Sequence, residues 1–293
     1  MLVAAALVPD TVLLVPGASG RRDVAGSLRA AALAAVTAAV ARADRVVVVA
    51  PGERTGGRAT GPDVAALRAS PDGALAPVGR VRASLASSGV PEHLVPAVVR
   101  DLTDPGAGTA VPRDEVGGAT AVALHLLAAA GWAGPTGCLE LERPSAARAA
   151  AAVDDDGREA DEAGAAGPDE HAERLRAAGE RVAGTGRVAL VVVGSASGRH
   201  GPDAPLADDP DAPAHDARLV ADLRTADPAA RARLRTLDAP TAAALAVTGW
   251  GPWQVLLGAV GDATGAPADV RADVRGEVLL GAQHVVGTWT VAA

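Results

Sequence analysis

Three short runs of aliphatic residues, each ended by a loop signal, constrain the fold of this chain more than any other feature. The runs cover residues 2–8, 46–49 and 188–193; Pro9-Asp10 ends the first, Pro51-Gly52 ends the second, and a glycine and serine loop follows the third. Apolar runs of this length without regular polar alternation are typical of strands that are buried on both faces. We therefore expect a sheet that is covered by helices on both sides.

The segment between the first two runs predicts a helix. Apolar residues recur every four positions across residues 24–40, and Asp23 is placed to act as the N-cap. Strand, helix and strand form a βαβ unit. Further helices are expected at 118–130, 214–225, 228–236, 240–248 and 252–260, and further strands at 137–142, 277–280 and 284–289. We interpret residues 1–293 as one α/β domain, a three-layer sandwich with a central, mostly parallel or mixed sheet flanked by helices.

The composition limits which residues can fill the core and which catalytic mechanisms are available. Hydrophobic residues make up 49% of the chain, but Phe and Tyr are absent and only four Trp are present. Trp253 and Trp289 lie in apolar patterns, so we expect both to be buried. The chain also lacks Lys, Asn and Ile, as expected for a GC-rich bacterial genome, and the missing lysine excludes Schiff-base and P-loop chemistry.

The charge and the cysteine content limit the binding partners and the cellular compartment that we expect for this chain. Most of the net charge of −8 comes from residues 153–170, and we predict that residues 153–168 form an acidic, flexible insertion. The nearly neutral remainder offers no basic groove, so no nucleic-acid partner is expected. One cysteine, Cys138, suits a reducing compartment, and the apolar start is too short and too interrupted for a membrane span or a signal peptide. We expect a cytoplasmic protein without a membrane partner.

The loop after the third apolar run is a candidate binding site, because ligands bind at strand ends in open α/β sheets. It contains Ser195, Ser197 and His200, but it does not match the G-x-S-x-G elbow or a Walker A loop. A hydrolase that uses one of these serines with His200 is a possible interpretation, although no positioned acid can be named. His125 lies in an apolar helical pattern and is expected in the core.

Several segments together resemble the class III extradiol ring-cleavage dioxygenases, namely the LigB-type catalytic subunit. Residues 2–16 resemble the opening of a LigB-like group in which the first strand runs into P-H-P-P-L-L. Residues 191–197, Ala204-Pro205 with Asp216, residues 251–259 and residues 284–290 resemble that group's third strand, proline-rich loop, tryptophan helix and last strand. The resemblance covers nearly the whole chain and implies a LigB-like fold.

Active members of this family hold Fe(II) with two histidines and one carboxylate, and a further histidine acts as acid and base. The resemblance places the three ligand positions on Asp10, Gly52 and Gly249, and the acid/base position on His200. Two of the three metal donors are therefore missing. Glu53, His200 and His284 are the candidate substitutes.

The resemblance and the missing donors lead to two main hypotheses. The first is a LigB-like protein with a degenerate iron site and no cofactor, which does not cleave rings. It would bind a small aromatic molecule or act as a partner subunit or homo-oligomer. The second is a metal-dependent extradiol dioxygenase or related oxidoreductase with substituted ligands. In both, the pocket is expected where Asp10, Gly52, Glu53, Ser195, Ser197, His200 and His284 meet.

Overall fold

The computed structural model describes residues 1–20, 23–52, 74–143, 168–184, 186–261 and 268–292. Its centre is one mixed sheet with the strand order β4-β3-β6-β2-β7-β1-β9-β8, and β5 pairs with β3. The four central strands are parallel, and antiparallel strands extend the sheet on both sides. The strands are β1 (Leu2–Val8), β2 (Arg45–Pro51), β3 (Ala74–Arg82), β4 (Val99–Leu102), β5 (Thr109–Pro112), β6 (Thr136–Leu141), β7 (Val188–Val193), β8 (Val270–Leu279) and β9 (Ala282–Val291). The predicted α/β fold class, a mixed sheet between layers of helices, is confirmed.

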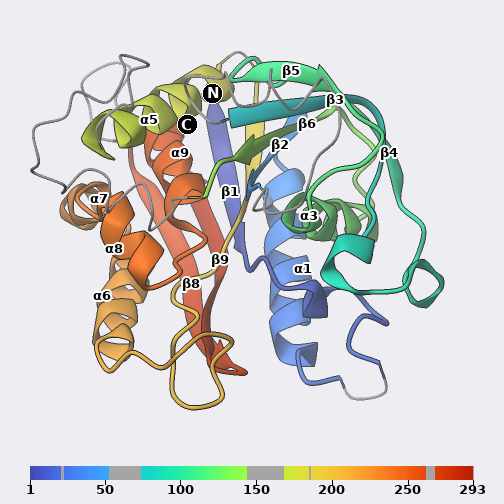
Figure 1. Cartoon of the computed structure of the whole chain (residues 1–293). Coiled ribbons are helices and arrows are strands. Elements are labelled where there is room, and N and C mark those ends of the chain that lie inside the picture. Colours follow the sequence, from blue (N-terminus) through green and yellow to red (C-terminus); the bar gives the residue numbers. More distant parts are fainter. Residues whose placement is uncertain (21–22, 53–73, 144–167, 185, 262–267, 293) are drawn as a thin grey trace, which may run out of the picture.

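Helices cover both faces of this sheet (Figure 1). One layer contains α1 (Gly26–Val40) and α3 (Gly118–Ala129); the other contains α5 (Pro168–Ala183), α6 (Ala212–Thr225), α7 (Pro228–Arg235), α8 (Ala239–Ala244) and α9 (Trp250–Val260). Short 3-10 turns lie at Val12–Leu14, Ala86–Ser88 and Glu92–Leu94. No helix in the part of the chain that the structure describes is long and apolar enough to span a membrane.

The valine runs are continuous because both faces of each central strand are buried. Val47 and Val49 of β2 pack in the core beneath α5 and α9, whereas Val46 and Val48 pack in the core beneath α1 and α3. Successive side chains of a strand point to opposite faces, so two covered faces require apolar residues at every position. The continuous apolar sequence of the central strands therefore follows from the presence of a helix layer on each face of the sheet.

The predicted buried residues lie in these two cores. Trp253 is 3% exposed, and Trp289, like Cys138, is fully buried. The indole N–H of Trp289 donates to the carbonyl of Leu223 over 2.8 Å, so its burial leaves no unpaired donor. His125 is also buried and hydrogen-bonds the carbonyl of Ala83. The predicted burial of Trp253, Trp289 and His125 is confirmed.

Other elements differ from the sequence-based expectation. The closing strands are longer than the predicted segments, because β8 and β9 form a continuous hairpin. The strands β3, β4 and β5 and the helix α5 were not predicted. Residues 53–72, whose Gly-, Arg-, Pro- and Thr-rich sequence predicts a long loop, lie outside the described residues, as do all but the last residue of the acidic insertion at 153–168.

Candidate functional site

The carboxyl ends of three central strands bring candidate residues together. Asp10 follows β1 and Ser195 follows β7, and these two strands pair in parallel. Gly52 follows β2, which pairs with β7 on its other side. His284 lies near the start of β9, whose antiparallel direction places that start at the same end of the sheet. Strand pairing alone therefore gathers residues that are far apart in the chain.

Asp10, Ser195 and His284 form one hydrogen-bonded chain. Ser195 Oγ lies 2.7 Å from Asp10 Oδ1 and 3.0 Å from His284 Nδ1. An ionised carboxylate can only accept, so the single hydroxyl proton of Ser195 goes to Asp10. His284 must then carry its proton on Nδ1 and donate it to Ser195 Oγ. The direction His284 to Ser195 to Asp10 is opposite to the one that activates a serine nucleophile.

Burial determines the charge of His284. The residue is 5% exposed. Burial lowers its pKa, and the negative charges of Asp10 and Glu277 oppose that shift only in part. His284 is therefore neutral near pH 7, and the tautomer with a proton on Nδ1 satisfies the contact with Ser195.

Arg143 provides the positive charge beside Asp10. Its Nε donates to the carbonyl of Gly52 over 3.0 Å, and a terminal guanidinium nitrogen lies 3.8 Å from Asp10 Oδ2. The side chain of Arg143 is 34% exposed and that of Asp10 is 15% exposed. Both charged groups can therefore be reached from solvent. Sequence reasoning missed Arg143, since nothing in its neighbourhood distinguishes it from the other arginines.

A second polar cluster surrounds Asp216. Its carboxylate, fully buried, accepts from the Ser197 amide over 3.1 Å, from Ser197 Oγ over 2.5 Å and from His200 Nε2 over 2.7 Å. His215 Nδ1 lies 3.7 Å away, too far for a hydrogen bond, so its influence is electrostatic. Burial opposes ionisation of Asp216, but these neighbours outweigh it and hold the pKa of the carboxyl below its usual value.

The contacts of this second cluster argue against a hydrolase that uses Ser195 or Ser197 with His200. Ser197 and His200 both bind Asp216 and are not hydrogen-bonded to each other, while Ser195 contacts His284 instead of His200. A nucleophilic serine needs a hydrogen bond to its base. Neither serine meets that condition with His200. Asp216, which supplies the missing acid, could have been noticed because it shares the buried stripe of α6 with Leu219 and Leu223.

The two glycine positions implied by the family resemblance are closely packed. A Cβ on Gly249 would lie 2.4 Å from Cζ2 of Trp253, and a Cβ on Gly52 would lie 3.1 Å from the carbonyl oxygen of Leu141. Real Cβ contacts are essentially never under 3.0 Å. The Gly249 amide also donates to the carbonyl of Ser195 over 2.9 Å, which fixes this backbone against the site. Position 249 therefore cannot carry a glutamate without displacement of Trp253.

The donor set does not fit the iron of the family. Among the residues that the structure describes, no group of three or more His, Cys, Asp or Glu side chains is placed to hold a metal ion. Asp10 and His284 lie on either side of Ser195, which hydrogen-bonds to both. His200 is bound to Asp216. Glu53, the remaining candidate substitute, lies outside the described residues.

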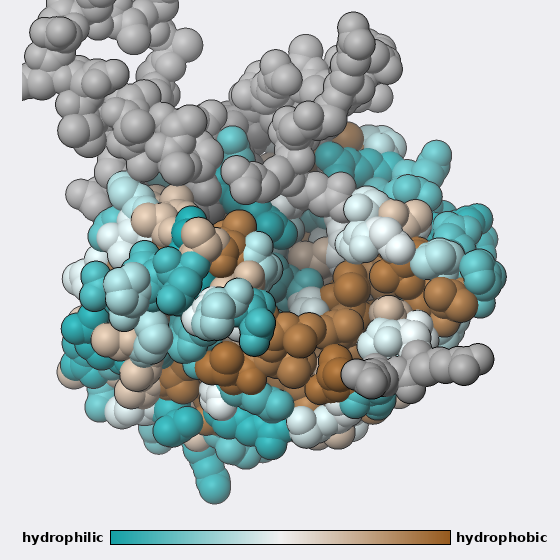
Figure 2. Space-filling model, turned by 60° about the horizontal axis from the view of Figure 1, so that its bottom comes forward, coloured by the Kyte–Doolittle hydropathy of each residue, from teal (hydrophilic) through white to brown (hydrophobic). Residues whose placement is uncertain are grey.

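The surface at this end of the sheet is partly apolar. Figure 2 shows apolar side chains forming a continuous area beside hydrophilic ones around a hollow. Leu280 and Leu206 are exposed, and Leu280 adjoins Gly281, whose carbonyl accepts from the His200 amide over 2.9 Å. An apolar surface next to a few polar groups is typical of small-molecule sites.

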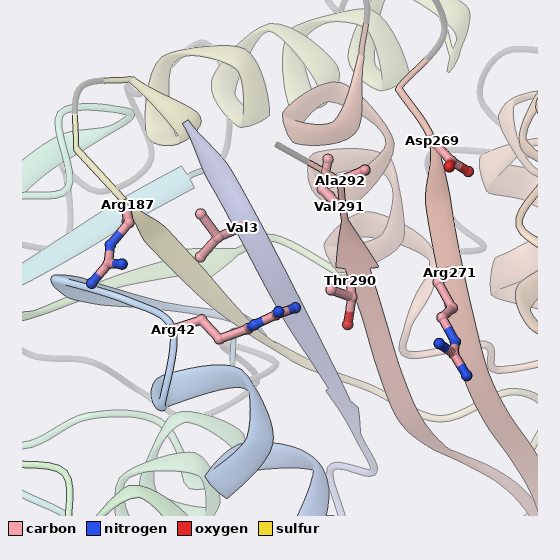
Figure 3. Close-up of a pocket in the computed structure, with 8 residues that line it drawn as sticks. All are labelled: Val3, Arg42, Arg187, Asp269, Arg271, Thr290, Val291 and Ala292. Carbon is pink, nitrogen blue, oxygen red and sulfur yellow. The ribbon is translucent and has the colours of Figure 1, made fainter.

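Two surface cavities lie elsewhere. One of about 440 Å³ lies at the opposite end of β1 and is lined by Arg42, Arg187 and Arg271 together with Thr290 (Figure 3). The other, of about 380 Å³, lies between α1 and the β8–β9 hairpin. Neither is lined by Asp10, Ser195 or His284, so the expected pocket at these residues stays a prediction.

Comparisons with known proteins give little further guidance. No family model matches the chain, and no curated protein matches it. Among solved structures it is similar to the uncharacterized protein JW3007 from Escherichia coli K12, with 12% sequence identity and a TM-score of 0.44, over 99% of this chain and 100% of that chain.

Proposed function

We propose that this chain is a LigB-like protein that binds a small hydroxylated aromatic molecule at the Asp10–Ser195–His284 cluster and does not cleave its ring. The observation that carries the proposal is the position of Ser195. Its Oγ lies within hydrogen-bond distance of both Asp10 and His284. Asp10 and His284, two of the candidate metal donors, therefore bind a serine instead.

Charge compensation at Asp10 supports the same proposal. A metal ion would neutralise a carboxylate at this strand end, and here the Arg143 guanidinium, 3.8 Å from Asp10, supplies the positive charge. A side chain at either of the other two family positions would require its neighbours to move, since a Cβ on Gly249 would lie 2.4 Å from Trp253 and a Cβ on Gly52 would lie 3.1 Å from the carbonyl oxygen of Leu141. The negative charge of Asp10 is therefore compensated by Arg143 without a metal ion.

The residues also indicate a ligand class. Asp10 can accept a hydrogen bond from a phenolic hydroxyl, and Arg143 can bind a carboxylate. The apolar area around this end of the sheet can cover a ring. A small hydroxybenzoate combines these three features, and 3,4-dihydroxybenzoate is a suitable probe.

Isothermal titration of the purified full-length protein with 3,4-dihydroxybenzoate under anaerobic conditions tests the proposal. We expect saturable binding that Asp10→Asn and Arg143→Ala each weaken by about tenfold, the effect of losing one charged contact of about 1.4 kcal/mol. Asp203→Asn, at an exposed position, is the matched control and should bind like the parent. Absence of binding, or equal binding by Asp10→Asn, would exclude this site.

The second hypothesis, a metal-dependent enzyme with substituted ligands, predicts a different result in the same samples. About one metal per chain, with ring cleavage abolished by a chelator, would replace our proposal by that hypothesis.

A further inference from the structure

The strand β8 forms one end of the sheet, and in the described residues it pairs on one side only, with β9. The Ala292 amide donates to the Asp269 carbonyl, so odd-numbered residues of this register direct their backbone groups toward β9. Even-numbered residues of β8 therefore direct theirs outward. The outward carbonyl of Val274 accepts from Arg224 Nε over 3.1 Å, in agreement with this alternation.

The sequence of β8 is complementary to itself when it is read in the opposite direction. A twofold axis at Val274 would place Arg271 opposite Glu277 and Asp273 opposite Arg275 of a second copy. On the other face it would pair Val270 with Val278, Ala272 with Gly276, and Val274 with its own copy. Each charged side chain of the strand then faces the opposite charge, which stabilises antiparallel pairs.

Backbone geometry is compatible with the same register. In this pairing the even-numbered residues of the two copies lie opposite one another, so their outward N–H and C=O groups can bond reciprocally. A shift of two residues in one direction would place Asp273 opposite itself, and a shift in the other direction would place Arg275 opposite itself. The register with complete charge complementarity is therefore also one in which the backbone groups match.

We infer that β8 pairs with β8 of a second copy of this chain, joining the two sheets across a twofold axis at Val274. The charges lie on the sheet face opposite to α6, since α6 packs on the face where Val220 contacts Gly276. Arg224 must release the Val274 carbonyl, or share it, for the strands to pair. An exposed edge strand is open to pairing unless a group of this kind protects it, so Arg224 limits the association.

Sedimentation velocity of the full-length chain over a concentration series tests this inference. We expect a concentration-dependent dimer, and Asp273→Arg should weaken it by about tenfold or more, because the symmetry turns two attractive contacts into repulsive ones. Arg275→Asp should act alike, and the double variant Asp273→Arg/Arg275→Asp should restore the dimer. Arg224→Ala should strengthen it.

Asp114→Arg makes the same charge change away from β8 and should leave the dimer intact. Circular dichroism of each variant separates loss of pairing from loss of fold. A monomer at every concentration for both the parent and Arg224→Ala would overturn the inference. So would a dimer that Asp273→Arg does not weaken, or a folded double variant that stays monomeric.

Discussion

The indole ring of Trp253 occupies the space that any side chain at position 249 would need, because a Cβ on Gly249 would lie 2.4 Å from Cζ2 of that ring. The two residues face each other within the first turn of α9, where the Trp253 amide donates to the Gly249 carbonyl over 2.8 Å. Packing of the tryptophan and absence of a side chain at 249 are therefore coupled.

Gly249→Ala should destabilise the protein by about 1 to 3 kcal/mol, the usual range for overpacking in a core. In a Trp253→Leu background the same change should cost less, since a smaller side chain leaves room for the new methyl group. Urea unfolding of the four proteins measures this coupling. Gly198→Ala is the control, because its Cβ would make only an ordinary contact, 3.5 Å from Pro205. Equal costs in both backgrounds would contradict the packing account.

Trp289→Ala should cost about 3 to 5 kcal/mol, as expected for truncation of a fully buried aromatic side chain. It removes core volume and leaves the Leu223 carbonyl without its donor. Trp132→Ala, at a partly exposed position, should cost less. A Trp289→Ala variant that unfolds at the same urea concentration as the parent would show that the core does not depend on this ring.

Stability should fall with acidity in part through His284. Burial lowers the folded-state pKa of His284 below the unfolded value of 6.5. As the pH falls, the unfolded chain therefore binds a proton at this histidine before the folded chain does. The contribution of His284 is therefore fully present above about pH 6.5 and is lost as the pH falls toward the folded pKa. His284→Gln should reduce the difference in unfolding free energy between pH 7.5 and pH 5.5. His125, whose pKa burial also lowers, should act in the same direction.

Asp216→Asn should destabilise the chain by about 1 to 3 kcal/mol, because an amide cannot accept from Ser197 and His200 as a carboxylate does. The lowered pKa of Asp216 also means that its stabilising contribution is present above pH 3.8 and declines as the pH falls below it. Thermal unfolding at neutral pH measures the first effect, with Asp203→Asn as the control. A variant as stable as the parent would show that the buried cluster is not structural.

The purified protein should contain much less than one equivalent of iron, manganese or zinc. Loss of a group that only supports a metal ligand typically costs about 10- to 100-fold in affinity, and the resemblance places two of three ligand positions on glycine. Elemental analysis measures the content, and oxygen uptake with catechols after anaerobic Fe(II) loading measures ring cleavage. Stoichiometric metal together with oxygen uptake would contradict the prediction.

Local sequence determined much of the architecture. The strands β1, β2 and β7 were predictable because a strand that is buried on both faces must be apolar at every position. The helix α1 was predictable because the face that packs on the sheet must be apolar, which repeats apolar residues at helical spacing. The strands β4 and β5 were missed because they are short and largely exposed, and β3 was missed because it mixes buried and exposed positions and contains Pro77 and Gly79. The positions of Asp10, Ser195 and His284 at strand ends or in a terminal strand were also readable, so these residues could be named as candidates.

Tertiary structure alone decided what those candidates do. Asp10 and Ser195 are 185 residues apart in the chain, and Ser195 and His284 are 89 apart. Their contact depends on which strands pair and in which register, and this is set by the summed packing of both cores. The same holds for Asp216 with His200 and for Trp253 against Gly249. Local patterns report which face of an element is buried, whereas contacts between distant side chains exist only after the whole sheet has assembled.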